Sequence, residues 1–392
     1  MSMILRRTSH RVFCLLLLLI LCPTAFAQTA ASVLPAPPDT PMPPPTDQPP
    51  PEVPLPNPIP LGSGFLVSGS LDARTRTSDT GRTGGVWINT AELDIQHNLS
   101  YHGKANGNIF LQVMSEDPPD IRHGQDIEIG QAYITYRLPI EADFNSTAYA
   151  KVGQFQIPFG LLAVYDPHLQ ILQPLSDQSL GIRNDFGAAV SGRLYGYLNY
   201  DFSLTTGTGP DHIYVNPNRV VCFRLGRTFT TRNGVVNVGG SLLQGRLPIT
   251  DITAADPFAV ELPPSGRVRA DRDESGDRFV SKSRIAGDIS YGFNRVTARG
   301  EFDTGADSDQ RILGYYAEGN YRFTTRLSAA VASSLFVYPN GNSNASRDSI
   351  GLTYASSRNL TVRAQYQFLR DVPRDESGIV RHRFTVQVLL RF

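Results

Sequence analysis

The sequence has few cysteines, few lysines and no surplus of basic residues. Of its 3 cysteines, Cys14 and Cys22 lie in the first 27 residues, so Cys222 has no partner for an intramolecular disulfide in the rest of the chain. Lys+Arg and Asp+Glu are both 36. Nucleic-acid-binding domains usually carry a basic excess, so we expect no nucleic-acid partner. No run of about 18 apolar residues occurs, which excludes a bundle of transmembrane helices.

Residues 1–27 have the organisation of a secretory signal peptide. Three arginines accompany the start of an apolar run at Val12–Leu21, and Ala25-Phe26-Ala27 forms a small-residue cleavage site. The apolar run is too short to span a membrane. Cleavage removes three arginines and no acids, so the expected mature net charge is 33 − 36 = −3. We therefore predict export across the inner membrane.

Proline is concentrated directly after the predicted signal peptide. Fourteen of the 29 prolines lie between Pro35 and Pro60. Proline removes a backbone donor and disfavours both helix and sheet. We therefore predict a disordered periplasmic segment over residues 28–61, which is either a tail without a partner or an extended spacer.

From residue 62 onward, apolar and polar residues alternate. In Leu198–Leu204, for example, the leucines, Tyr200 and Phe202 share one face, and Asn199, Asp201 and Ser203 share the other. This period of two is the signature of a β-strand. Sixteen such segments are predicted, near residues 64–76, 86–101, 107–117, 127–139, 147–157, 184–194, 197–207, 219–230, 235–246, 278–292, 294–305, 311–323, 326–338, 347–357, 359–371 and 380–392.

The connections between these segments alternate in length. Tight turns are expected at 195–197, 292–294 and 356–359, and longer connections at 118–126, 158–183, 208–218, 247–277, 303–310, 339–346 and 371–379. An even number of strands with short turns at one end is typical of an outer-membrane barrel. A soluble sandwich of these strands would bury charged residues in its core, which is too costly. We predict an all-β, 16-stranded antiparallel transmembrane barrel over residues 62–392.

The last predicted strand ends on an aromatic residue. His382, Phe384, Val386, Val388, Leu390 and Phe392 alternate with more polar positions. This resembles the C-terminal signal of bacterial outer-membrane proteins, in which a terminal Phe is recognised by the barrel-insertion machinery. We therefore expect that machinery, outer-membrane lipid and lipopolysaccharide as partners.

The segment Lys151–Gly160 carries a family resemblance. Its Gly-x-Phe-x-x-Pro-Phe-Gly pattern, from Gly153 to Gly160, is similar to that of the phosphate-selective porin O and P family, as are Gly181–Gly187 and Asn199–Phe202. The resemblance implies a homotrimer of sixteen-stranded barrels whose third loop folds inward to narrow the pore. Loop 158–183 stands at that position. The matching and neighbouring loop residues are Pro158, Phe159, Gly160, Tyr165, Asp166 and His168.

The chain departs from that family in its basic residues. Anion-specific members carry an arginine ladder and a lysine cluster, whereas this chain has only Lys104, Lys151 and Lys282. Strand parity places several charged residues on the inner wall, either as an anion track or as solvated pairs such as Asp288 with Arg299. The candidate pore-lining cations are Lys151, Arg183, Arg193, Lys282, Arg284, Arg295, Arg299 and Arg363, with Arg224, Arg381 and Arg383 on similar faces; the acidic counterparts are Glu92, Asp94, Asp201 and Glu318.

Signals for metal binding or catalysis are weak. Acidic stretches at Asp271–Asp277 and Asp303–Asp309 could hold a divalent cation, but neither has a metal-loop spacing, so solvated surface loops are favoured. No nucleophile elbow or phosphate-binding glycine pattern occurs. We predict no cofactor and no metal site. A lipase-type barrel using His168 is the enzymatic alternative.

These features predict a non-enzymatic outer-membrane porin. It would allow passive diffusion of small hydrophilic solutes, with small anions such as phosphate preferred. The alternative is a structural outer-membrane anchor whose Pro-rich segment contacts the cell wall.

Overall fold

The computed structural model describes most of the chain after residue 56. The described ranges are 57–78, 83–101, 104–116, 126–139, 146–163, 180, 183–209, 219–231, 234–248, 271–272, 278–308, 310–337, 344–370 and 382–392. The predicted signal peptide and most of the Pro-rich segment lie outside these residues. So do Tyr165, Asp166, His168 and Arg381.

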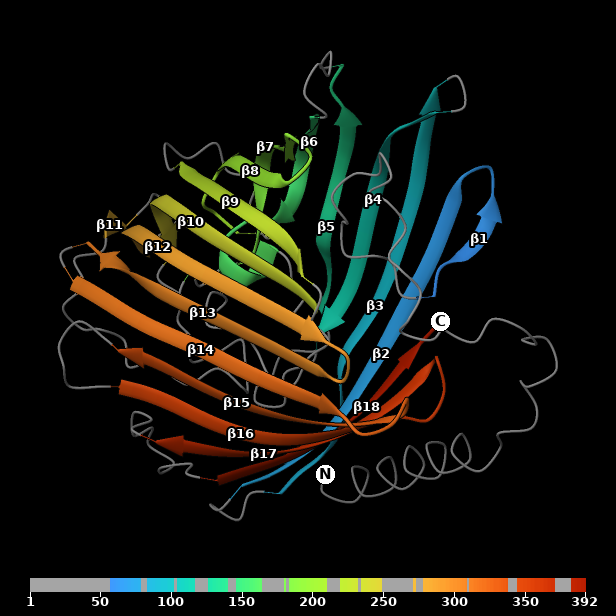
Figure 1. Cartoon of the computed structure of the whole chain (residues 1–392), viewed down its shortest axis with the longest axis vertical. Helices are drawn as coiled ribbons and strands as arrows, with labels where there is room; N and C mark the ends of the chain where they lie inside the picture. Colours follow the sequence, from blue (N-terminus) through green and yellow to red (C-terminus); the bar gives the residue numbers. More distant parts are fainter. Residues whose placement is uncertain are drawn as a thin grey trace, which may run out of the picture. The chain divides into compact units, whose positions relative to one another are not determined.

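The described residues form one closed antiparallel sheet (Figure 1). The sheet contains 18 strands, of which sixteen form a ring and two, β1 and β11, are short additions. The ring closes because β2 pairs with β18, and it is continuous across β10 because β10 pairs with both β9 and β12. This confirms the predicted barrel. The ring consists of β2 (Phe65–Ser78), β3 (Thr83–Tyr101), β4 (Lys104–Glu116), β5 (Asp126–Arg137), β6 (Thr147–Gln156), β7 (Asn184–Leu194), β8 (Leu198–Thr205), β9 (Val220–Thr231), β10 (Gly234–Pro248), β12 (Arg278–Phe293), β13 (Val296–Asp307), β14 (Gln310–Arg322), β15 (Leu327–Val337), β16 (Asn344–Ala355), β17 (Leu360–Arg370) and β18 (His382–Arg391).

Two short strands extend the ring. β11 (Asp271–Arg272) pairs with the start of β12, and β1 (Ile59–Gly62) pairs with the start of β2 through Ile59↔Val67 and Pro60↔Leu66. The end of the predicted Pro-rich segment is therefore paired, against the expectation of an unpaired chain through residue 61. Proline is tolerated in β1 because an edge strand does not need every backbone donor.

Apolar side chains face outward and polar ones face inward. On β12, Ile285 and Ile289 are 55% and 49% exposed, whereas Lys282 and Arg284, on the opposite face of the same strand, are 5% and 1% exposed. Exposed isoleucine, leucine, valine and phenylalanine recur in this way on most strands, as expected for a wall in contact with acyl chains. Within the described part of the chain, no helix is long and apolar enough to cross a membrane.

Aromatic residues gather at the short-turn end of the wall. Tyr195 and Tyr197 flank the β7–β8 turn, Tyr291 and Phe293 end β12, and Tyr321 and Phe323 lie where β14 ends. The two rings of each pair contact each other, with centroids 6.1, 6.5 and 5.0 Å apart. Such a girdle seats a barrel at the membrane–water interface.

One predicted long connection is a tight turn. β13 continues to Asp307 and β14 begins at Gln310, so the connection expected over 303–310 is wrong. Ser308 adopts a positive φ of 55° and donates its backbone N–H to the carbonyl of Ser281. Asp303 is consequently buried on the inner wall instead of lying in a surface loop. The polar alternation near the strand end was misread as loop sequence.

The outward position of Ile289 gives a direct test of the membrane-facing wall. We expect Ile289→Arg to lower the free energy of unfolding from detergent or lipid by about 2–4 kcal/mol, the cost of a basic side chain in the middle of the apolar belt. Ile289→Leu should cost much less, because it keeps the apolar contact. Equilibrium unfolding in lipid vesicles measures both, and equal stability of the two variants would contradict the orientation.

Candidate functional site

The loop between β6 and β7 begins and ends against the inside of the wall. Ile157 donates its backbone N–H to the carbonyl of Arg183 at 2.9 Å, which closes the base of the loop. The chain then enters the short 3-10 helix η1 (Gly160–Ala163). Ile157, Phe159 and Leu161 are each 0% exposed. The described ends of loop 158–183 are therefore packed against protein.

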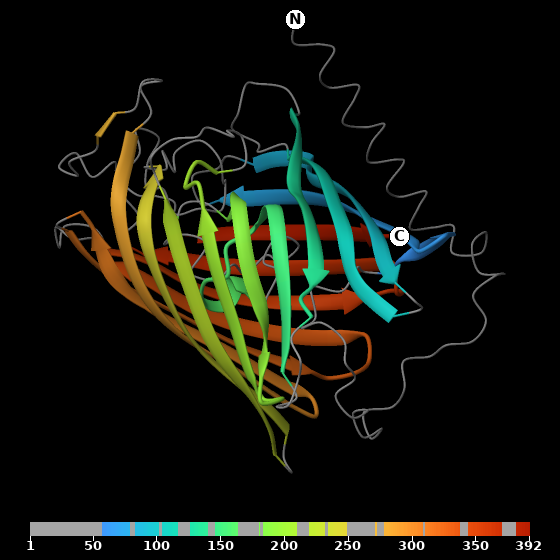
Figure 2. The ribbon, with the colours of Figure 1, turned by 90° about the horizontal axis from the view of Figure 1, so that it is seen from above.

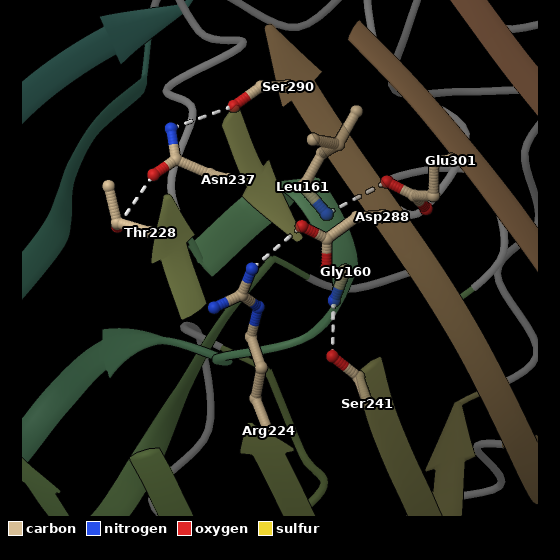
Figure 3. A network of polar contacts seen from close by, with 9 residues as sticks. All are labelled: Gly160, Leu161, Arg224, Thr228, Asn237, Ser241, Asp288, Ser290 and Glu301. Atoms are coloured by element: carbon tan, nitrogen blue, oxygen red, sulfur yellow. Dashed lines mark hydrogen bonds and ion pairs between the residues drawn. The ribbon is translucent and has the colours of Figure 1, made fainter. Parts of the chain in front are cut away.

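Two backbone donors attach the start of this loop to the wall (Figure 3). The N–H of Gly160 donates to Ser241 Oγ of β10 at 3.0 Å, and the N–H of Leu161 donates to Glu301 Oε2 of β13 at 2.9 Å. Gly160 has a φ of +54°, and a Cβ there would lie 2.9 Å from the Glu301 carboxyl carbon. Glycine therefore meets both the backbone and the steric requirement at this position.

The far end of the loop is attached through a lysine. Lys282 Nζ, on β12, donates to the carbonyl oxygen of Leu180 at 2.7 Å. The lysine is only 5% exposed, and Leu180 is fully buried. The ammonium predicted to line an anion track thus contacts the chain itself.

An apolar cluster lies between the loop and the inner wall. Ile157, Phe159 and Leu180 come from the loop region, and Val220, Cys222, Leu243, Leu247 and Ala286 come from β9, β10 and β12. The Cys222 thiol is buried and lies 3.3 Å from the carbonyl of Pro158, to which it donates. Burial of these side chains stabilises the attachment of the loop ends, because each large apolar group contributes about 1.5–3 kcal/mol.

Several wall charges are paired across strands. Arg224 of β9 reaches Asp288 of β12 at 2.7 Å, passing over β10 at Gly239. A Cβ at Gly239 would lie 2.3 Å from the guanidinium, so the glycine makes room for the pair. Arg284 pairs with Asp307, and Arg74 with Asp72 at 2.6 Å.

A row of polar side chains continues along the wall from these pairs. Thr228 Oγ1 donates to Asn237 Oδ1 at 2.7 Å, and the Asn237 amide donates to Ser290 at 3.1 Å (Figure 3). Along the same row of the sheet, Ser290 of β12 is paired with Arg299 of β13, and Arg299 with Glu318 of β14. Arg299 Nη1 lies 3.3 Å from Glu318 Oε1. Arg299 therefore pairs with Glu318, whereas Asp288, the partner considered from the sequence, pairs with Arg224.

The other predicted pore-lining cations lie in different surroundings. Lys151 Nζ lies 4.3 Å from the centroid of the Tyr133 ring on the inner face of β5 and β6. Arg193 donates to Asn199 at 3.2 Å, and Arg363 donates to Gln387 at 3.0 Å. The carbonyl of Arg183 closes the loop base, as described above.

Arg295 is placed differently from the prediction. β13 begins at Val296, so Arg295 lies in the exposed turn after β12, where it donates to the carbonyl of Phe323. Asn294 adopts a positive φ of 46°, which tightens this turn and moves the strand start by two residues. Arg295 is therefore not part of the inner wall.

Some inner-wall residues were not identified from the sequence. Ser241 carries no signal in the sequence that marks it as a loop partner, and Asp303 was predicted in a surface loop. The alternation puts Gln365, Gln367 and Gln387 on the polar face of their strands, where they are at most 2% exposed, but it does not mark them as pore-lining candidates, because they carry no charge. Among the described residues, no group of His, Cys, Asp and Glu is arranged to hold a metal ion.

No family model matches the chain, and no curated protein matches it. Solved structures do. An anion-selective porin from Comamonas acidovorans aligns with a TM-score of 0.58 at 12% identity, covering 83% of this chain and 98% of that one. OprB from Pseudomonas putida aligns with a TM-score of 0.58 at 9% identity, covering 84% and 94%. OmpF from Salmonella typhi aligns with a TM-score of 0.55 at 14% identity, covering 84% and 98%.

At these identities, the likeness shows the fold. The chain has the sixteen-stranded barrel of outer-membrane porins, with an apolar outer face and a polar inner face. A closed barrel is the β-structure that can satisfy every backbone group in lipid. The protein is therefore a β-barrel of the bacterial outer membrane.

The buried thiol of Cys222 reports whether the loop stays attached. We expect Glu301→Ala to raise the rate of maleimide labelling at Cys222 by about tenfold, which corresponds to about 1.4 kcal/mol of lost attachment energy. The lost acceptor leaves the Leu161 N–H without its partner. Mass spectrometry of the peptide containing Cys222 measures the rate.

The matched control is Glu318→Ala, an inner-wall glutamate that hydrogen-bonds Arg299 and Tyr316 instead of the loop. Its labelling rate should equal that of the unmodified chain. Equal rates in all three proteins would show that Glu301 does not hold the loop.

Proposed function

We propose that this protein is a porin that gives small hydrophilic solutes a passive path across the outer membrane. The observation that carries the proposal is the polar inner wall of a closed barrel, with charged and amide side chains on β2, β3, β9, β12 to β14 and β16 to β18. Solutes would move down their gradients, selected by pore width and wall charge. The channel needs no covalent chemistry and no cofactor.

We further propose that loop 158–183 narrows the path. Its two described ends are attached to inward-facing groups of β9, β10, β12 and β13. The loop therefore starts and finishes inside the barrel wall. Pro158, Phe159 and Gly160 form the attached start, and Tyr165, Asp166 and His168 belong to the proposed narrow part.

The proposed selectivity is for small anions such as phosphate. Carboxylates pair with four inner-wall arginines, namely Arg74, Arg224, Arg284 and Arg299. The preference for anions would therefore depend on other inner-wall cations. Arg193 contacts a neutral amide, and Lys151 contacts an aromatic face. The anion-selective porin from Comamonas acidovorans shares the fold, which is consistent with this preference.

The proposed assembly is a homotrimer in contact with lipopolysaccharide. One of the similar structures, from Vibrio cholerae, is described as a trimer form. The Phe392 strand is proposed to engage the insertion machinery. In the folded chain, Phe392 exchanges two backbone hydrogen bonds with Gly69 of β2, at 2.8 and 3.0 Å.

A second function, as an anchor to the cell wall, is favoured by one observation. Asn57 donates to the carbonyl of Arg358 at 3.2 Å, in the short turn between β16 and β17. The Pro-rich segment would thus join the barrel at the short-turn end, which faces the periplasm in outer-membrane barrels. Deletion of residues 28–56 would separate the roles, since an anchor needs the segment and a channel does not.

Reconstitution into a planar bilayer tests the channel directly. We expect stepwise conductance from the purified protein, because an open polar lumen conducts ions. Glu301→Ala should give larger or noisier steps than Glu318→Ala, since Glu301 accepts a hydrogen bond from the loop, whereas Glu318 bonds Arg299 and Tyr316. A complete absence of steps from folded protein would contradict the porin proposal.

Charge substitutions test the anion preference. We expect Lys151→Gln together with Arg193→Gln to lower the anion-to-cation permeability ratio by about twofold, equivalent to about 0.4 kcal/mol in the barrier. Reversal potentials in a salt gradient give this ratio. Lys151→Arg with Arg193→Lys conserves both charges and should leave it unchanged. A cation preference in the unmodified protein would contradict the selectivity proposal.

A further inference from the structure

Arg227 is a cation on the outer, lipid-facing side of the barrel. On β9 it continues the outward column of Phe223 and Leu225, which are 39% and 37% exposed, and its own side chain is exposed. In the sheet it pairs with Leu198, the residue directly after the β7–β8 turn. Arg227 therefore lies at the level of the aromatic girdle, where lipid headgroups meet the apolar belt.

Two aromatic rings hold the Arg227 guanidinium. Its central carbon lies 4.5 Å from the centroid of the Tyr197 ring and 4.6 Å from the centroid of the Phe229 ring. Both distances are within the range of a cation–π contact, which extends to about 6 Å. The two rings orient the guanidinium, and its N–H donors are left for other partners.

No acidic side chain neutralises Arg227 within the described part of the chain. Segments 194–200, 225–231 and 234–240, which surround it, contain no Asp or Glu. Among the described residues, the guanidinium contacts only the two rings and has no hydrogen bond or ion pair. Arg224, on the inner face of the same strand, is instead paired with Asp288. Arg227 thus presents a planar set of donors to the membrane interface, and such a fork matches phosphate in a bidentate arrangement.

The outer wall beside Arg227 is hollowed on the side of the apolar belt. Gly240 of β10 and Gly287 of β12 are paired and exposed, two residues further from the short turn than the row of Arg227. A Cβ at Gly240 would meet its nearest atom at 3.9 Å, and a Cβ at Gly287 would meet none within 4 Å. The next outward pair, Leu242 and Ile285, is 51% and 55% exposed and forms the far rim. This apolar depression gives room for an acyl chain below a headgroup at Arg227.

We propose that Arg227 binds the headgroup phosphate of a membrane phospholipid, with an acyl chain in the depression at Gly240 and Gly287. The guanidinium donates two parallel N–H groups to phosphate oxygens, while Tyr197 and Phe229 hold its plane in place. Short turns of outer-membrane barrels face the periplasm, so the lipid belongs to the periplasmic leaflet. The site lies on the outer face and is independent of the channel proposed above.

Removal of the guanidinium tests the site. We expect Arg227→Gln to lower the affinity for the first bound molecule of phosphatidylglycerol by about tenfold, because the charge-assisted hydrogen bonds to the phosphate are lost. Native mass spectrometry of the folded protein in detergent, titrated with phosphatidylglycerol, counts the bound lipid molecules and gives this affinity.

The matched control is Arg311→Gln at the start of β14, the end away from the aromatic girdle. Arg311 is exposed on the same face as Leu313 and Tyr315, which are 42% and 39% exposed. Within the described residues, its guanidinium contacts no aromatic ring. The substitution removes the same charge from the outer face, and the affinity should equal that of the unmodified chain.

Two further variants separate an oriented guanidinium from general attraction between charges. Arg227→Lys keeps the charge but loses the planar pair of donors, and it should bind about threefold more weakly than the unmodified chain. Tyr197→Leu combined with Phe229→Leu keeps Arg227 but removes both rings, and it should weaken binding by a similar factor. Unchanged affinity in both variants would contradict the proposed geometry.

Two other ligands identify what the site recognises. A galactosyl diacylglycerol has acyl chains without phosphate, and glycerol phosphate has phosphate without acyl chains. Each should bind at least about tenfold more weakly than phosphatidylglycerol. The proposal is overturned by equal affinity of Arg227→Gln and the unmodified chain, by an equal loss in Arg311→Gln, or by equally tight binding of the phosphate-free lipid. Equally tight binding of glycerol phosphate would overturn it as well, because the site would then be one for free phosphate esters.

Discussion

The structure depends on the pairing of every strand of the ring with two neighbours. In a bilayer an unpaired backbone N–H or C=O costs several kcal/mol, so the sheet has to close. Closure here runs through β18 and β2, where the last strand of the ring meets the first (Figure 2). Once the ring is closed, the two-residue repeat of each strand assigns one face to lipid and the other to the lumen. The apolar outer face and the charged inner face both follow from this pairing.

The inner wall is adapted locally to hold a loop. Most of it is polar, but Val220, Cys222, Leu243 and Leu247 form an apolar patch that packs against Ile157 and Phe159. Around this patch, Ser241, Glu301 and Lys282 bind backbone groups at the two ends of the loop. Charges that look like solute contacts in the sequence therefore serve attachment. The same carboxylate that could repel an anion instead accepts a backbone hydrogen bond.

The sequence predicted the strands well because each strand is long and its alternation is regular. All sixteen segments have a counterpart in the ring, and the errors lie at strand ends. Arg295 was predicted in a strand but lies in the turn before it, and Asp303 was predicted in a loop but lies in β13. Both errors arise because a tight turn leaves little trace in the hydrophobic pattern. The pair of Arg299 with Glu318 was also not predicted, since pairing across strands depends on register, which the alternation alone does not determine.

By itself the sequence determined the class of fold, the number of strands in the wall and the face on which side chains within the strands lie, but not the placement of residues near strand ends such as Arg295 and Asp303. These properties are local, because a period of two and the positions of the turns are written in neighbouring residues. The tertiary structure alone decided which charges meet. Lys282 reaches a carbonyl 102 residues away, and Leu161 reaches a carboxylate 140 residues away. Such contacts arise only when the ring closes and brings distant strands and the loop to the same place.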